Sequence, residues 1–213
     1  MTVSKNMTSN PVTCTPEMGV FEAFELMKRE GVQRLPVLDS QGSLVGIISE
    51  KNITSAAAAE EKVSIVEFAL LLSRLKVGDI MTKEVITVAV DDPVEQAAKK
   101  MSDNDISILP VIDGDGRLVG VVSRSDLFRL LLELFGSRHY GFRVTFRIKD
   151  QPGVIAKLAI ALEKIGANII SIGNLDSDQG YSTIIMKLSG VEKESLKNTL
   201  LPLVDGNLDI REV

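Results

Sequence analysis

The sequence predicts a mixed α/β protein in which a duplicated unit is followed by a different, smaller domain. Two observations carry this prediction. The chain repeats itself without a gap at an offset of 74 residues, so that Arg34–Ile53 aligns with Ile108–Leu127. After residue 141 the pattern changes to an order of strand, helix, strand, strand, helix and strand, which is typical of ferredoxin-like domains.

Each copy of the repeat is expected to form a strand, a helix, two strands and a second helix. Val20, Ala23, Phe24 and Met27 are spaced as one face of a helix that Gly31 can end. Two apolar runs, residues 35–38 and 44–48, are joined by an Asp…Gly segment that indicates a hairpin. The second copy repeats these signals, with Val94, Ala97, Ala98 and Met101 on its helix.

Residues 142–213 show the alternation and helical spacing of an independent domain. Residues 142–149 alternate apolar and basic side chains, which indicates a half-buried strand. Pro152 can start the next helix and Gly166 can end it. Strands are expected at 168–172, 181–188 and 208–213. The expected division of the chain is 1–54, a connecting helix at 55–76, 77–136, a linker at 137–141, and 142–213.

Composition excludes several classes of function. The chain has 24 basic and 29 acidic residues and a net charge of −5, which disfavours nucleic-acid binding. Its apolar runs are far shorter than the roughly 20 residues of a membrane span, and no secretory signal is visible, so we expect a cytoplasmic protein. With one cysteine, Cys14, and one histidine, His139, no disulfide or metal site is expected. An enzymatic function would need a nucleophile paired with a base, and the sequence shows no such pair, so we do not expect an enzyme.

The repeated unit resembles a tandem pair of cystathionine-β-synthase (CBS) motifs, called a Bateman module. The resemblance rests on Met-Thr near the start of each copy, Leu-Pro-Val at 35–37 and 109–111, the Asp…Gly hairpins, and Val-Gly-x-x-Ser followed by Asn52 or Asp126. The C-terminal segment resembles an ACT domain through Asp150-Gln-Pro-Gly153 and Ala167-Asn168-Ile169. The combination is similar to proteins of the acetoin-utilisation AcuB type.

This resemblance implies a non-enzymatic regulatory protein that senses a ligand and needs no cofactor. CBS modules bind adenosine compounds such as AMP, ADP, ATP or S-adenosylmethionine as effectors. The alternative is a ligand-free adaptor or regulatory subunit that binds a metabolic enzyme.

The resemblance also implies two related clefts, which we name by their ribose-binding positions. The Asp126 cleft would use Ser123, Arg124, Ser125, Asp126, Met7, Val12, Val32 and Gln33. The Asn52 cleft would use Ser49, Asn52, Met81, Ile86, Ile106 and Ser107. We expect nucleotides to prefer the Asp126 cleft, because a carboxylate accepts from both ribose hydroxyls and Arg124 aligns with Glu50. Ser123-x-x-Asp126 also fits a helix capping box, and both interpretations stay open.

The ACT resemblance implies an amino-acid site at the loop before its first helix, formed by Asp150, Gly153, Val154 and Asn168. The other interpretation of this loop is a turn and helix start in a domain that only dimerises. A homodimer is expected in either case, because a small sheet of this kind leaves an edge strand exposed.

Overall fold

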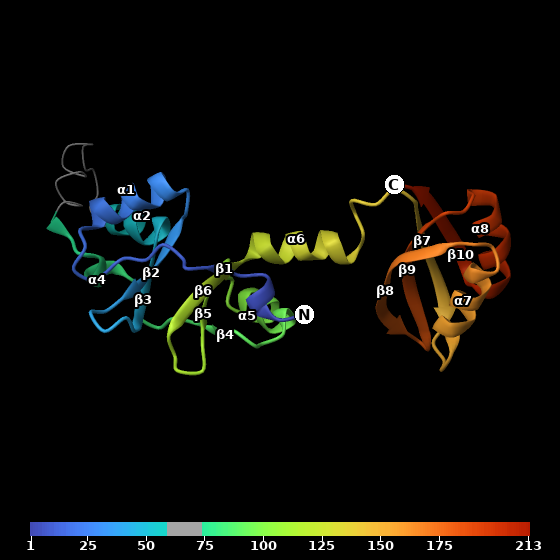
Figure 1. Cartoon of the computed structure of the whole chain (residues 1–213), viewed down its shortest axis with the longest axis horizontal. Coiled ribbons are helices and arrows are strands. Elements are labelled where there is room, and N and C mark those ends of the chain that lie inside the picture. The colour runs from blue at the N-terminus through green and yellow to red at the C-terminus, as the bar shows by residue number, and fades with distance from the viewer. Residues whose placement is uncertain (59–73) are drawn as a thin grey trace. The chain divides into compact units, whose positions relative to one another are not determined.

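The computed structural model describes residues 1–58 and 74–213, which form two compact units, Met1–Leu127 and Phe128–Val213 (Figure 1). The boundary between the two units falls inside the helix Arg124–Leu134. The finer boundaries drawn from the sequence stay predictions. Residues 59–73 of the expected connecting helix lie outside the described part of the chain.

Both copies form the expected helices and hairpin, whereas the first expected strand is formed only in the second copy and is a single bridge between Cys14 and Val37 in the first. The first copy contains a 3₁₀ turn at Val3–Lys5, β1 (Thr8–Ser9), α1 (Val20–Glu30), β2 (Arg34–Leu38), β3 (Leu44–Ser49) and α2 (Glu50–Ala58). The second contains α4 (Val77–Ile80), β4 (Val88–Ala89), α5 (Val94–Asp103), β5 (Ile108–Ile112), β6 (Leu118–Ser123) and α6 (Arg124–Leu134). The α/β fold class is therefore confirmed.

The two hairpins of the repeat have the same register. Leu35 pairs with Ile48 in the first, and Leu109 pairs with Val122 in the second. Each carries a bulge at the same place, before Leu38 and before Ile112. The equal register explains why the two copies align without a gap.

Each copy has its own hydrophobic core. Met27 and Met101 are both buried at the centre of these cores. Cys14 is buried among the side chains of the first core, and burial raises the pKa of its thiol to about 12. At neutral pH the thiol is therefore protonated, as expected of a small core residue.

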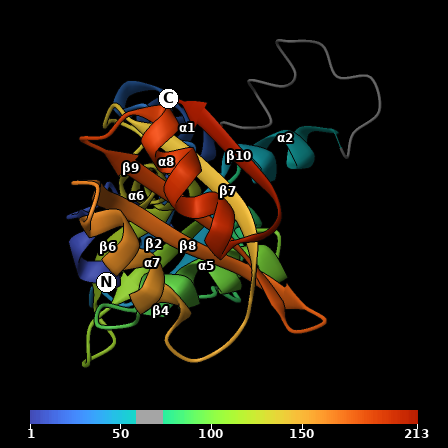
Figure 2. The ribbon, with the colours of Figure 1, turned by 90° about the vertical axis from the view of Figure 1, so that its right-hand side faces the viewer.

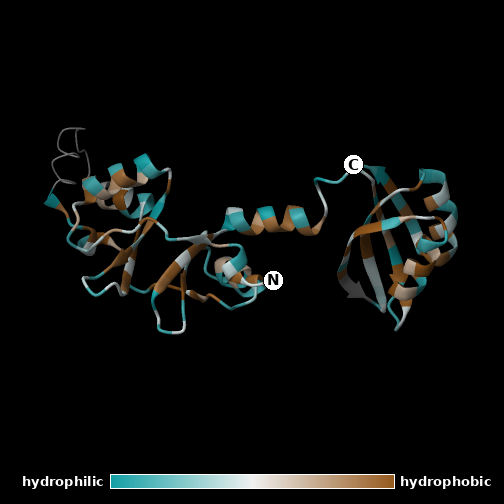
Figure 3. Ribbon diagram, in the orientation of Figure 1, coloured by the Kyte–Doolittle hydropathy of each residue, from teal (hydrophilic) through white to brown (hydrophobic). Residues whose placement is uncertain are grey.

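The second unit contains β7 (Phe142–Lys149), α7 (Val154–Glu163), β8 (Asn168–Asp178), β9 (Tyr181–Ser189), α8 (Lys193–Leu200), a 3₁₀ turn at Leu201–Leu203 and β10 (Asp205–Glu212). Its sheet has the order β10-β7-β9-β8. Helices α7 and α8 lie together on one side of this sheet (Figure 2). Phe146, Leu158, Ile184 and Leu196 are among the core residues of this unit. In Figure 3 the helices carry both hydrophobic and hydrophilic bands, as one-sided packing requires.

Strand β8 is longer than the sequence suggested, ending at Asp178 rather than near Ile172. It continues because Gln179 and Gly180 both take positive φ, 52° and 79°, which allows a tight two-residue hairpin. Two irregularities of register, at Ile169/Ser171 and Leu175/Ser177, interrupt the alternation that the sequence reasoning relied on.

Among the helices of the described residues, we find none with the length and apolar character that crossing a membrane requires.

Candidate functional site

The first segment of each copy pairs with the last strand of the other copy's hairpin. Thr8 and Ser9 of β1 pair with Val121 and Gly120 in the last strand of the second copy. In the mirror arrangement, Thr82 exchanges two backbone hydrogen bonds of 2.9 and 3.0 Å with Ile47 in β3 of the first copy. The Asn52 cleft is therefore lined by residues of both copies.

Two repeated glycines make this exchange possible. A Cβ on Gly120 would lie 2.6 Å from Met7 Sδ and 2.9 Å from the carbonyl oxygen of Thr8. A Cβ on Gly46 would overlap the side chain of Met81 in the same way. The Met-Thr and Val-Gly signals of the repeat thus belong to one contact, in which a methionine from one copy packs over a glycine of the other.

The repeated Ser-x-x-Asp and Ser-x-x-Asn segments form capping boxes. Asp126 Oδ2 accepts from the backbone N–H of Ser123 at 2.7 Å and from its hydroxyl at 2.5 Å, and the N–H of Asp126 donates back to Ser123 Oγ at 3.3 Å. Asn52 Oδ1 accepts the equivalent bonds from Ser49 at 3.0 and 2.5 Å. The capping interpretation is confirmed in both copies, and the caps fix these polar side chains at the starts of α6 and α2.

The Asn52 cleft is a cavity of about 630 Å³. Four of its six expected residues line it: Ser49, Asn52, Ile86 and Ile106. Met81 instead packs against Gly46, and Ser107 accepts a hydrogen bond from a neighbouring residue of the cleft. The lining also includes Ile47, Lys51, Ser55, Ala56, Ile80, Thr82, Glu84, Val85, Asp105, Ile108 and Pro110. Asn52 Nδ2 lies 3.5 Å from Thr82 Oγ1, so this threonine of the second copy borders Asn52 in the cleft.

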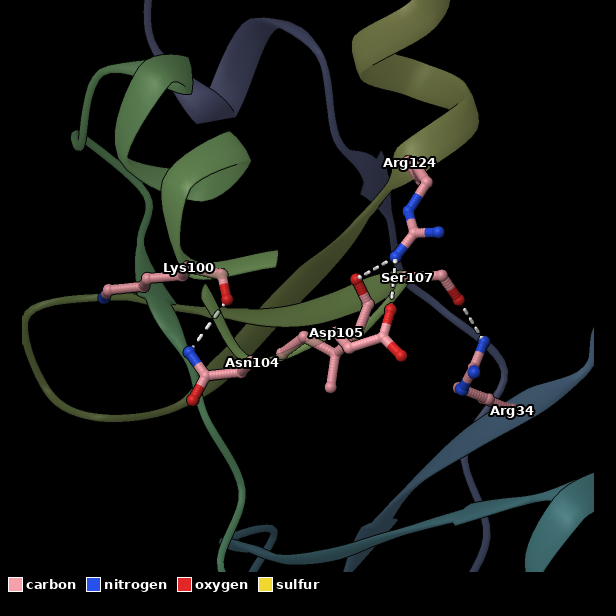
Figure 4. Close-up of polar contacts among 7 residues, drawn as sticks. Arg34, Lys100, Asn104, Asp105, Ser107 and Arg124 are labelled. Carbon is pink, nitrogen blue, oxygen red and sulfur yellow. Dashed lines mark hydrogen bonds and ion pairs between the residues drawn. The ribbon is translucent and has the colours of Figure 1, made fainter. Parts of the chain in front are cut away.

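Sequence reasoning missed Arg34, which lines the Asn52 cleft. Its Nη1 donates a 2.5 Å hydrogen bond to Ser107 Oγ, across the junction between the copies (Figure 4). The repeat hid this residue because Arg34 aligns with Ile108. The only signal for it was an arginine directly before an apolar strand.

Arg124 and Glu50, which the alignment equates, have different partners. The Arg124 guanidinium donates to the carbonyl oxygen of Ile106 at 3.0 Å and lies 3.6 Å from Asp105 Oδ1 (Figure 4). Glu50 forms a 2.8 Å ion pair with Lys28. Arg124 is thus held beside the 105–106 segment of the Asn52 cleft, and the charge of Glu50 has a counter-ion that the sequence reasoning did not consider.

The other residues expected in the Asp126 cleft are distributed over both copies. Met7 lies against Gly120, three residues before Ser123. Val12 and Val32 pack against the core of the first copy, and the carbonyl of Gln33 accepts from the N–H of Glu50 at 3.1 Å. Their convergence on Ser125 and Asp126 around a ligand stays a prediction.

In the second unit, three of the four expected amino-acid-binding residues share a cavity. Asp150, Gly153 and Val154 line a hollow of about 180 Å³ at the start of α7, together with Gln151, Ile155, Asn174, Ser182 and Ile184. Asn168 lines a different, shallow depression beside Glu163 and Gly166. The structure therefore does not bring Asn168 to this cavity, and another asparagine of β8, Asn174, lies there instead.

Comparison with known families agrees with this architecture. The CBS-domain model matches residues 3–59 and 77–133, and the TTHA0829-like ACT-domain model matches residues 140–211. The chain belongs to the CBS-domain family. CBS and ACT domains are regulatory modules.

Three solved structures illustrate the likeness. The CBS pair of protein MJ0100, in complex with 5′-methylthioadenosine and S-adenosyl-L-methionine, is 33% identical, with 62% of this chain and 99% of that chain covered and a TM-score of 0.53. CBSX2 in complex with AMP is 28% identical, with 62% and 97% covered and a TM-score of 0.55. An acetoin utilisation protein, AcuB, from Vibrio cholerae is 24% identical, with 65% and 95% covered and a TM-score of 0.54, and shares the fold.

Several curated relatives are much longer than the part of them that this chain matches. The L-aspartate semialdehyde sulfurtransferase of Methanocaldococcus jannaschii is 34% identical over 131 residues, which cover 61% of this chain and 23% of the relative. The match covers only about a quarter of the length of the first such relatives.

Proposed function

We propose that this protein is a non-enzymatic regulatory sensor that binds an adenosine-containing ligand between its two CBS copies. The Asn52 cleft carries the proposal: it is a cavity of about 630 Å³ at the junction of the copies, and Arg34, Thr82 and Asn52, whose side chain is fixed by Ser49, lie on its walls. Ligand-bound CBS pairs of similar sequence support it, with S-adenosyl-L-methionine and 5′-methylthioadenosine in one and AMP in another.

The lining of this cleft suits each part of a nucleotide. Asn52 and Thr82 offer hydrogen bonds to the ribose hydroxyls. Ile86 and Ile106 offer apolar surface to the adenine, and Arg34 offers a cation to a phosphate. Binding would draw on both copies, so a ligand that fits one arrangement of the pair better would shift the pair toward it.

The Asp126 cleft is proposed as the second adenosine site, and the two sites can be compared by exchanging their distinguishing side chains. Asp126→Asn and Asn52→Asp each install the residue that already caps the equivalent helix of the other copy, so both caps should survive. If the carboxylate governs ribose binding, Asp126→Asn should weaken nucleotide binding at the Asp126 cleft, the tighter site, by about tenfold. Asn52→Asp should strengthen nucleotide binding at the Asn52 cleft, the weaker site.

Two-site calorimetric titration with AMP and ATP measures both affinities, and thermal melting verifies that each variant is folded. A change confined to the Asn52 variant would reverse the expected order of the clefts. If no adenosine compound binds to or stabilises the wild-type protein, the adaptor function is favoured instead. Several large apolar side chains of α6 would suit such an adaptor, because Phe128, Leu131, Leu132 and Leu134 are exposed in this chain.

The ACT domain is proposed to dimerise through β8, an edge strand of its sheet. Ile169, Ile172 and Leu175 of this strand are exposed, whereas the aliphatic side chains at 184, 186 and 188 belong to the core. The opposite edge, β10, carries Asp209, Arg211 and Glu212 and is a poorer candidate for pairing.

Ile172→Lys should therefore convert a wild-type dimer into a monomer, because it places a charge in the apolar interface. Light scattering on the full chain at high micromolar concentration measures the mass. Leu201→Lys is the matched control, since Leu201 is equally exposed but lies outside both edge strands. A monomeric wild type, or an Ile172→Lys variant that stays dimeric, would contradict this interface.

The ACT domain is further proposed to sense an amino acid at the cavity lined by Asp150, Gly153 and Val154. Gly153 begins α7 with a φ of 84° and no side-chain cap, so its backbone is open to a ligand.

A further inference from the structure

Ser182 is the polar exception on the buried side of β9. The strand turns Ser182, Ile184, Met186 and Leu188 toward the helices, and the last three are core residues. Ser182 is only 2% exposed, and within the described part of the chain its hydroxyl has no hydrogen-bond partner. A buried hydroxyl is normally paired, so this one needs a reason.

The reason we infer lies in the cavity at the start of α7, which Ser182 lines. Helix α7 is ten residues long, and its N-cap glycine supplies no side chain to the free N–H groups of the first turn. Such a helix start attracts a carboxylate. Asp150, on the same cavity, offers the opposite charge, so the site suits a small molecule with a carboxylate and an ammonium close together.

We propose that this cavity selects an α-amino acid with a short hydroxyl or amide side chain, and that Ser182 and Asn174 recognise that side chain. The proposal rests on the amino-acid sensing proposed above and names its substrate class. Apart from Gln151, the remaining wall is apolar, formed by Val154, Ile155 and Ile184, which disfavours a charged side chain. A hollow of about 180 Å³ also disfavours long or aromatic ones.

The test is calorimetry on the full chain with L-serine, L-asparagine, L-alanine and L-leucine. L-serine or L-asparagine should bind the wild type about tenfold more tightly than L-alanine, since a ligand hydrogen bond satisfies the buried hydroxyl. Ser182→Ala should remove this preference and leave L-alanine binding within about twofold. Thr183→Ala is the control, because Thr183 is the next residue of the strand and points to the opposite face.

The outcomes separate this inference from the function on which it rests. Equal binding of L-alanine and L-serine by the wild type would overturn the selectivity and leave amino-acid sensing standing. Loss of all amino-acid binding in a folded Ser182→Ala variant would make Ser182 a structural residue and overturn its role in recognition. If none of the four amino acids binds, both proposals fall.

Discussion

Replacing Arg34 with glutamine is expected to lower the affinity of the Asn52 cleft for AMP and ATP by about tenfold or more, because a charge-assisted hydrogen bond contributes about 1.5–3 kcal/mol. Binding of 5′-methylthioadenosine, which has no phosphate, should change by less than about twofold. The guanidinium lines the Asn52 cleft, and its hydrogen bond to Ser107 directs it across the junction of the copies. Isothermal titration with the three ligands measures the difference.

Arg117→Gln provides a control with the same change of charge. Arg117 lies in the second hairpin, outside the lining of the Asn52 cleft, and both side chains of its ion pair with Asp115 are largely exposed to solvent. Its replacement should leave all three affinities unchanged. An equal loss for AMP and 5′-methylthioadenosine in Arg34→Gln would mean that Arg34 supports the cleft rather than the phosphate.

Gly141→Ala is expected to destabilise the ACT domain by about 3 kcal/mol or more, since it forces a side chain into packed backbone. A Cβ on Gly141 would overlap the carbonyl oxygen of Leu188 in β9. The backbone has little freedom to retreat, because Gly141 also exchanges hydrogen bonds of 3.0 and 2.9 Å with Val213. For a domain of this size, the melting temperature should fall by at least about 12 °C.

Tyrosine fluorescence can report this unfolding selectively. The chain has no tryptophan, and its two tyrosines, Tyr140 and Tyr181, both lie in the second unit. Gly166→Ala is the control: no atom lies within 4 Å of its added Cβ, but its φ of 73° disfavours alanine by about 1 kcal/mol. If the two variants melt alike, the collision with Leu188 is not what constrains Gly141.

The repeat made most of the fold predictable, because two copies of one pattern support each helix and hairpin independently. It also exposed the capping boxes, since Ser49 and Ser123 each stand three residues before a polar partner. What it could not reveal is the exchange of Thr8 and Thr82 between the copies. Pairing between distant strands leaves no local periodicity in the sequence. Aligning one copy with the other also treats each copy as if it were structurally complete by itself.

The candidate sites were predictable where they follow the repeat and obscure where they break it. Arg34 escaped notice because its counterpart is an isoleucine. Ser182 was not predicted as a site residue because a serine in a strand is interpreted as facing solvent until its burial is known. Asn168 was expected in the ACT cavity from its motif, whereas it pairs with Ser189 at the start of β8, and Asn174, which pairs with Ile184 of the cavity, lies there instead.

The pairing of segments between the copies also determines when each segment can find its partner during synthesis. Thr82 can reach its partner Ile47 soon after it leaves the ribosome, but Thr8 must wait for Val121. At about 5–20 residues per second, that delay is roughly 6–23 s, during which the first segment has no strand to join. Val3 and β1 belong to the core and sheet of the second copy, so this segment stays unpaired until that copy is made. A translation pause before residue 121 would therefore leave β1 open to the wrong neighbour.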